Sequence, residues 1–257
     1  MKRNHLIITI LLLVLAALCY IFFDIMQTRL STDSTTNVLL RGVLSRAGLS
    51  LLFIWLLHLS GGRKYLVFKS GFLKMLLWSI PLFMVAFVNF PYSALIKNEL
   101  KIERFDLMPL YVLYVVFVSL LEEIVFRGTI FMLMKDWLRN SRHAPLLTTV
   151  FCSLIFAVFH FTNLFVGADI VSVLLQVTYT FLIGAMLTVC MLKSNNIWLC
   201  VVIHAIFNFG GLLVVNDIAI GNPHDIVFWV LTIVSGVLCA GHVIYSLIKL
   251  EKDYVSW

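Results

Sequence analysis

Long, almost uncharged apolar runs follow one another along this chain of 257 residues. A helix rises about 1.5 Å per residue, so roughly 20 apolar residues cross the roughly 30 Å hydrocarbon core of a bilayer. Eight runs reach or approach that length: residues 5–23, 43–59, 72–90, 107–131, 145–165, 169–192, 196–215 and 225–247. Because 61% of the residues are hydrophobic and only 12% are charged, a soluble domain is excluded. We therefore predict an all-α fold, a polytopic membrane helical bundle of about eight transmembrane helices.

Basic residues lie mainly in the connections between these runs. With the N-terminus in the cytoplasm, twelve Lys and Arg residues fall on the cytoplasmic side and six on the other side. The positive-inside rule therefore predicts a multi-pass protein of the cell membrane with both termini in the cytoplasm. These loops also explain the net charge of +6 without a nucleic-acid partner. The alternating charges of residues 97–106 predict a surface helix, and Pro81 is expected to kink the third run.

Five cysteines lie within apolar runs and none forms a C-x-x-C pair, so we interpret them as packing residues. The apolar run 5–23 is longer than the core of a usual signal peptide and no A-x-A site follows it. We expect it to be an uncleaved first span.

Three charged residues interrupt the run 107–131, in the string LLEEIVFRG. Each charge at the centre of a membrane helix costs roughly 2.5–3.5 kcal/mol, so such charges must face protein or a water-filled cavity. Glu123 and Arg127 are four residues apart, which places them about 40° apart around a helix and allows an ion pair. Glu122 lies about 100° from Glu123. It is the carboxylate without a partner on its own face, as suits a group that transfers protons.

Two further polar pairs lie in later runs: Phe156-x-x-x-His160 and His204-x-x-x-Asn208. Taken singly, each has a structural explanation, because a membrane histidine can bond to a backbone carbonyl and an asparagine can join two helices. The Glu123–Arg127 pair can also be purely structural. Together, a glutamate, two histidines and an asparagine form a set suited to acid–base chemistry and oxyanion stabilisation. We expect the three helix faces to line one cavity.

In this order on separate helices, E-E-x-x-x-R, F-x-x-x-H and H-x-x-x-N resemble the CAAX protease and bacteriocin-processing family (CPBP, also called Abi). The members of this family are intramembrane endopeptidases related to the type II prenyl-protein protease. The resemblance covers about residues 105–215. We accordingly divide the chain into N-terminal spans and loops (1–104), a catalytic core (105–215) and a last span with the C-terminal tail (216–257).

The resemblance implies a role for each motif residue. Glu122, together with His160, would activate the attacking water as the general base. His204 and Asn208 would hold the oxyanion of the tetrahedral intermediate, and Glu123 and Arg127 would brace the site. The family is often labelled a metalloprotease, so two alternatives stand: no cofactor, or a zinc ion held by Glu122, His160 and His204.

The resulting hypothesis is an intramembrane endopeptidase that cleaves membrane-associated peptides or proteins, in bacteriocin immunity, peptide maturation or surface-protein control. The expected partners are a membrane peptide or protein substrate, the lipid bilayer and a membrane protein partner, with no nucleic acid. Two alternatives use the same residues differently. One is a transporter or proton relay built on the buried Glu and His residues, and the other is a non-catalytic membrane scaffold or immunity protein.

Overall fold

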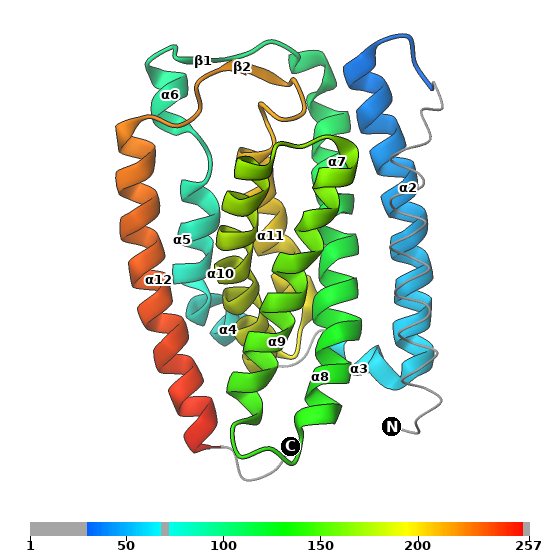
Figure 1. Cartoon of the computed structure of the whole chain (residues 1–257), viewed down its shortest axis with the longest axis vertical. Helices are drawn as coiled ribbons and strands as arrows, with labels where there is room; N and C mark the ends of the chain where they lie inside the picture. The colour runs from blue at the N-terminus through cyan, green and yellow to red at the C-terminus, as the bar shows by residue number, and fades with distance from the viewer. Residues whose placement is uncertain (1–29, 68–71, 254–257) are drawn as a thin grey trace.

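The computed structural model describes residues 30–67 and 72–253, which form a bundle of helices running in roughly the same direction (Figure 1). The predicted all-α membrane bundle is confirmed. The N-terminal half contains α2 (Ser34–Leu57), the π-helix η1 (His58–Gly62), α3 (Arg63–Leu66), α4 (Phe72–Trp78), α5 (Ile80–Val88), α6 (Tyr92–Ile96), β1 (Leu100–Ile102) and the 3-10 turn η2 (Phe105–Leu107). The remainder contains α7 (Met108–Glu123), the π-helix η3 (Ile124–Ile130), α8 (Phe131–Leu138), α9 (Ala144–Phe159), the 3-10 segment η4 (His160–Val166), α10 (Ile170–Ser194), α11 (Ile197–Gly211), β2 (Ala219–Gly221) and α12 (Ile226–Lys252).

Among the described residues, 5 helical stretches are long and apolar enough to cross a membrane: Ser34–Leu66, Phe105–Leu138, Ala144–Phe165, Ile170–Ser194 and Ile226–Lys252. The other three predicted spans account for the difference from eight. The run 5–23 lies outside the described residues, as does Cys19. The run 72–90 is divided into α4 and α5, and α11 is only 15 residues long.

The third apolar run, residues 72–90, is broken just before Pro81. Ser79 separates α4 from α5, and Pro81 occupies the first turn of α5, where its missing N–H leaves no helical bond unmade. The Ser79 hydroxyl donates to the Leu76 carbonyl at 2.8 Å, and the Ser79 backbone N–H donates to the same carbonyl at 3.1 Å. The third run is therefore divided into two helices at Ser79.

Four of the long elements begin at a side chain that caps the helix. Asp33, Asp169, Asn196 and Asp225 each accept a hydrogen bond from a backbone N–H in the first turn of α2, α10, α11 and α12 respectively. Such caps satisfy backbone donors that the helix itself cannot pair. They fix where each helix starts at the ends of the bundle.

The segment expected to form a surface helix is a strand instead. Lys101 in β1 pairs with Ile220 in β2, in an antiparallel register that also joins Leu100 to Gly221. An alternation of charged residues at every second position has the period of a strand, not of a helix. Leu100 is accordingly buried and Lys101 exposed. The prediction of a surface helix was wrong because it overlooked this period.

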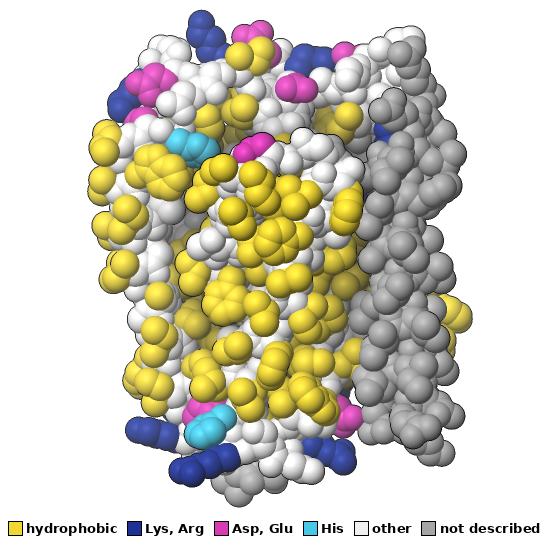
Figure 2. Space-filling model, viewed as in Figure 1, with side chains coloured by type: hydrophobic (Ala, Val, Ile, Leu, Met, Phe, Trp, Pro, Cys, Tyr) yellow, Lys and Arg dark blue, Asp and Glu magenta, His cyan; other side chains and the backbone are white. Residues whose placement is uncertain are grey.

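Apolar side chains cover the middle of the visible face, whereas charged side chains gather at its two ends (Figure 2). This distribution is that of a protein surrounded by lipid. In the interior, α11 packs against α5, α7 and α10 and is therefore enclosed by other helices of the bundle (Figure 1). The short helix α11 carries two of the predicted site residues, so its surroundings determine the geometry of the site.

Candidate active site

The site begins near the midpoint of the 34-residue helical stretch Phe105–Leu138. Glu122 and Glu123 form the last turn of α7, and Arg127 lies in the π-helix η3 that follows. π-Helical turns are rare and occur frequently at functional sites. Glu123 and Arg127 are 0% and 1% exposed, whereas the Glu122 side chain retains 21% exposure. Glu122 is therefore the acidic group of this turn that water or a peptide can reach.

A buried ion pair joins Glu123 to Arg127, as their spacing predicted. Arg127 Nη1 donates to Glu123 Oε1 at 2.8 Å, and Nη2 donates to the Gly184 carbonyl of α10 at 3.4 Å. The guanidinium carbon also lies 4.4 Å from the centre of the Phe156 ring in α9. Arg127 thus connects three helices as well as neutralising Glu123.

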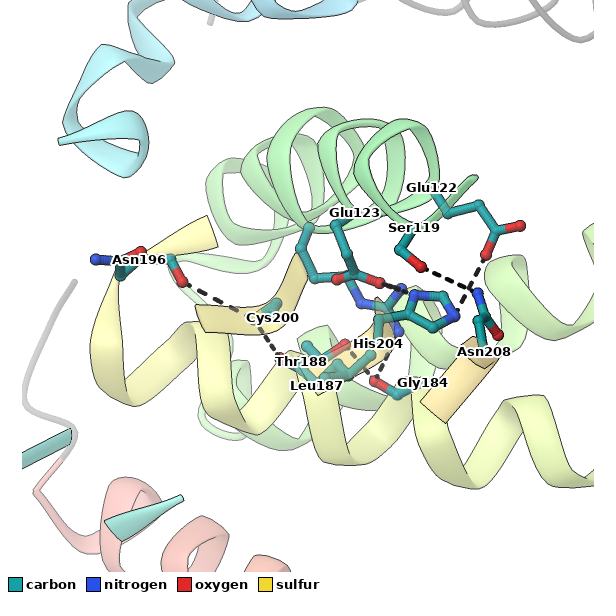
Figure 3. A network of polar contacts seen from close by, with 11 residues as sticks. Ser119, Glu122, Glu123, Gly184, Leu187, Thr188, Asn196, Cys200, His204 and Asn208 are labelled. Atoms are coloured by element: carbon teal, nitrogen blue, oxygen red, sulfur yellow. Dashed lines mark hydrogen bonds and ion pairs between the residues drawn. The ribbon is translucent and has the colours of Figure 1, made fainter. Parts of the chain in front are cut away.

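His204 of α11 is inserted between the two adjacent glutamates (Figure 3). Its Nδ1 lies 2.7 Å from Glu123 Oε1, and its Nε2 lies 3.5 Å from Glu122 Oε2. Since a carboxylate paired with Arg127 can only accept, His204 Nδ1 must donate to Glu123. Glu122 has no partner on its own helix, as predicted, but a second helix supplies one. Residue spacing compares the faces of a single helix, so it does not predict this contact between two helices.

Asn208 lies one turn beyond His204, and its Nδ2 donates to the Ser119 hydroxyl at 3.1 Å (Figure 3). Ser119 is 0% exposed and lies on α7, one turn before Glu122 and Glu123. Ser119 belongs to none of the three motifs. Its spacing nevertheless indicates a place in the site, because it lies three residues before Glu122 and four before Glu123, and residues so spaced share a helix face.

The backbone on either side of Asn208 is also held from outside α11. Asn89 Nδ2 donates to the Phe207 carbonyl at 2.7 Å, and the Tyr111 hydroxyl donates to the Phe209 carbonyl at 2.6 Å. These bonds come from the end of α5 and from the first half of α7. Neither donor belongs to a sequence motif. Their role depends on helix contacts that no local pattern predicts.

His160, the remaining motif residue, lies at the junction of α9 and η4. The Phe156 ring stands edge-on to both histidines, with ring centres 5.0 Å from His160 and 5.9 Å from His204. Phe156 therefore packs against both imidazoles. Among the residues that the structure describes, the buried Nε2 of His160 has no hydrogen-bond partner.

The candidate zinc ligands do not form a metal-binding group. Within residues 30–67 and 72–253, no group of three or more His, Cys, Asp and Glu side chains is arranged to hold a metal ion. Both ring nitrogens of His204 already face the carboxylates of Glu122 and Glu123. The set Glu122, His160 and His204 therefore does not fit a zinc ion in this arrangement.

Residues 104–210 match the model of the family described as type II CAAX prenyl endopeptidase Rce1-like. These residues include all three polar motifs, and the match confirms the resemblance to the CAAX protease and bacteriocin-processing family. Comparisons with curated proteins and with solved structures gave no match.

Proposed function

Because residues 104–210 match the Rce1-like type II CAAX prenyl endopeptidase family, we propose that this chain is an intramembrane endopeptidase in which Glu122 activates water. The family match supports endopeptidase activity within a membrane and a membrane-associated peptide as substrate. The observation that carries the residue assignment is the position of His204 between Glu122 and Glu123. His204 thereby connects Glu122, whose side chain is partly exposed, to the buried ion pair of Glu123 and Arg127.

In the proposed reaction, Glu122 with His160 orients a water molecule against the scissile carbonyl carbon. Glu122 takes one proton as the water oxygen bonds to that carbon, and the carbonyl oxygen becomes an oxyanion. When the intermediate collapses, the C–N bond breaks and the same proton passes to the leaving amine. The 21% exposure of the Glu122 side chain supports this role, because both water and peptide must reach it.

His204 Nε2 and Asn208 Nδ2 are the proposed donors to the oxyanion. His204 Nδ1 donates to Glu123, so a second proton on Nε2 would make this atom a donor directed toward the Glu122 side of the site. Asn208 has a second amide hydrogen beyond the one given to Ser119. Both donors are held before the substrate arrives, which is the arrangement that stabilises a developing charge.

The charge balance of the buried cluster supports one shared proton. Glu122, Glu123 and Arg127 together carry one negative charge, and one proton held between Glu122 and His204 makes the cluster neutral. A neutral group is favoured at membrane depth, where an unbalanced charge costs several kcal/mol. Glu123 and Arg127 are therefore proposed to orient His204.

The test is peptide cleavage by the purified full-length protein in detergent or nanodiscs. Glu122→Gln keeps the size and polarity of the side chain but cannot take the proton, so turnover should fall about 10²–10⁴-fold while the fold survives. Glu103→Gln, an exposed glutamate outside the site, is the matched control and should cleave like the wild type. Near-wild-type cleavage by Glu122→Gln would remove Glu122 from the role of base.

The same assay separates the open alternatives. Cleavage that persists after exhaustive chelation supports the route through Glu122 and His160, whereas loss and recovery on adding zinc would replace it. Precursor peptides, bacteriocins and membrane-anchored surface proteins should be compared as substrates, because immunity, peptide maturation and surface control differ in what is cut. A protein that cleaves none of them but moves protons across vesicles would instead be a proton relay.

A further inference from the structure

Three polar side chains that belong to no sequence motif lie near Glu122, on two elements that pack together. Asn163 belongs to η4, whereas Gln176 and Tyr179 belong to the first half of α10. Asn163 donates from its Nδ2 to Gln176 Oε1 at 2.7 Å and so joins η4 to α10. We refer to Asn163, Gln176 and Tyr179 as the polar strip.

The polar strip faces the proposed active site. Residues three apart in a 3-10 helix lie on one face, which places Asn163 on the same face of η4 as His160. Gln176 and Tyr179 are also three apart and share a face of α10. Tyr179 and His160 both interact with the charge of Glu122. The polar strip and the proposed base therefore border one region of the molecule.

The outer end of the polar strip can be reached from outside the bundle. Tyr179 is 44% exposed, and Asn163 and Gln176 are half-buried. The Tyr179 ring packs against Phe207 of α11, with ring centres 6.2 Å apart. The polar strip thus extends from the surface of α10 toward the partly exposed side chain of Glu122.

The two amides of the polar strip can bind the main chain of a peptide. A primary amide has a carbonyl acceptor and two N–H donors, so the bond between them leaves Asn163 Oδ1 as an acceptor and Gln176 Nε2 as a donor. In an extended peptide, the N–H and C=O of one residue point to the same side. One acceptor and one donor on neighbouring elements are the partners that such a residue requires.

Apolar surroundings make this pairing important for binding. Gln176 and Tyr179 lie within the apolar span Ile170–Ser194, next to Leu175 and Leu182, which are 65% and 63% exposed. Main-chain groups that enter such surroundings unpaired are strongly unfavourable. Three residues of α10 cover about 4.5 Å, and an extended peptide advances about 3.3 Å per residue, so the polar strip accommodates one or two residues.

We propose that the polar strip binds the main-chain N–H and C=O of one substrate residue beside the scissile bond. Asn163 Oδ1 accepts from the N–H, and Gln176 Nε2 donates to the C=O. The substrate is then an extended peptide that is recognised at this point by its main chain and not by a particular side chain. This proposal rests on the proposed function, because it describes how the same site holds its peptide.

The first test measures kinetics with the full chain in nanodiscs, on the peptide that the wild type cleaves best in the assay of Glu122→Gln. Asn163→Leu and Gln176→Leu each remove one amide at similar volume, so KM should rise about tenfold and kcat should change by less than about twofold. Thr178→Val is the matched control on α10, because it removes an exposed hydroxyl that donates to the Leu174 carbonyl. It should cleave with the KM of the wild type.

The second test changes the peptide, which a purely structural bond between η4 and α10 would not detect. An ester in place of one amide removes a single N–H, and this replacement is made in turn at the residues on both sides of the scissile bond. At one position the wild type should lose about tenfold in kcat/KM, whereas Asn163→Leu should lose little further. Full additivity at every position would overturn the proposal.

Failure of this proposal differs from failure of the proposed function. If Glu122→Gln loses cleavage while both variants of the polar strip keep the wild-type KM, the proposed function stands and the peptide site is overturned.

If the wild type cleaves no peptide, the proposed function fails, and binding is measured with the photoreactive peptide acetyl-Leu-Ala-photoleucine-Ala-Leu-amide. Its cross-links should map to residues 160–163 and 176–179 of the wild type and should be lost in Gln176→Leu. The same mapping on the wild type decides the question if the variants do not fold. Labelling confined to other segments, or unchanged labelling of Gln176→Leu, would overturn the peptide site.

Discussion

At the scale of single residues, one imidazole connects the two adjacent glutamates of the site. Glu123 Oε1 accepts from both Arg127 and His204, at 2.8 and 2.7 Å, so its charge is shared between two donors. Within the described part of the chain, Glu123 Oε2 and Arg127 Nε have no hydrogen-bond partner. Such a cluster is stable only while all of its charges are present, because a single charge left behind in a buried site is strongly unfavourable.

Arg127→Ala should therefore destabilise the protein as well as reduce its activity. Removing the guanidinium strands the buried Glu123 carboxylate, which in general costs about 3–5 kcal/mol. Thermal unfolding in detergent and the amount accumulated in membranes measure this loss. Lys101→Ala, which removes an exposed cation from β1, is the control and should unfold like the wild type. A stable but inactive Arg127→Ala protein would give Arg127 a direct role in the chemistry.

Ser119→Ala should loosen Asn208 without altering any charge. The lost hydrogen bond is worth about 0.5–1.5 kcal/mol, and a misplaced oxyanion donor should slow turnover about 10–100-fold with KM nearly unchanged. Ser50→Ala is the matched control, because Ser50 is equally buried and its hydroxyl has no partner among the described residues.

A double-mutant cycle distinguishes positioning from a general structural effect. If Ser119 acts through Asn208, adding Ser119→Ala to Asn208→Ala should change turnover little further. Full additivity of the two losses would show that Ser119 acts independently of Asn208.

At the scale of elements, the site depends on how closely α11 approaches the end of α5. A Cβ added at Gly210 would lie 2.5 Å from the Asn89 carbonyl oxygen, so only glycine permits this contact. The contact allows Asn89 to reach the Phe207 carbonyl, next to Asn208. Gly210 has no side chain, but its close contact with Asn89 positions the backbone of α11 next to Asn208.

Gly210→Ala should push α11 away from α5, with a loss of about 1–3 kcal/mol from overpacking and a parallel loss of turnover. Gly236→Ala provides a matched control in α12, since an added Cβ there meets nothing within 4 Å. It should leave turnover unchanged and stabilise the helix by about 0.5–1 kcal/mol. Unfolding midpoints and turnover of both variants check the pair, and an active, stable Gly210→Ala protein would contradict it.

At the scale of the whole molecule, charged contacts join separate elements at the end of the bundle that carries β1 and β2. Asp33, the cap of α2, accepts from the Thr36 backbone N–H and from Arg104 Nη1. Arg104 precedes η2, and its Nη2 also contacts Asp106. The hydrogen bonds from Thr36, followed by that from Arg104, lower the pKa of Asp33 to about 2 from its ordinary 3.8. A lowered carboxyl pKa gives stability that is present above about pH 4 and is lost as the pH falls toward 2.

Asp33→Asn should therefore flatten part of the acid dependence of unfolding. Asparagine caps a helix as well as aspartate does, so the substitution mainly removes the charge. Between about pH 5 and 2, the thermal midpoint of the wild type should fall further than that of the variant. Asp217→Asn, at an exposed turn of the same end, should retain the full wild-type dependence. Parallel curves for the wild type and Asp33→Asn would contradict the assignment.

Sequence alone determined the membrane class and most of the long helices, and it singled out the polar side chains of the candidate site. Those properties depend on local periods: apolar length predicts a span, and the four-residue spacing predicted the Glu123–Arg127 pair. The orientation of the chain and the roles of the six motif residues stay predictions. The charges near Lys101 alternate at every second position, which is the period of a strand, although we predicted a helix there.

Only the tertiary structure decided how these groups meet. His204 contacts Glu123 across 81 residues of sequence, Asn208 contacts Ser119 across 89, and Asn89 reaches Phe207 across 118. No periodicity extends over such separations, because the position of one helix against another is set by side-chain packing and by close approaches such as that at Gly210. The sequence specified which faces are polar, and packing determined that the imidazole of His204 lies between Glu122 and Glu123.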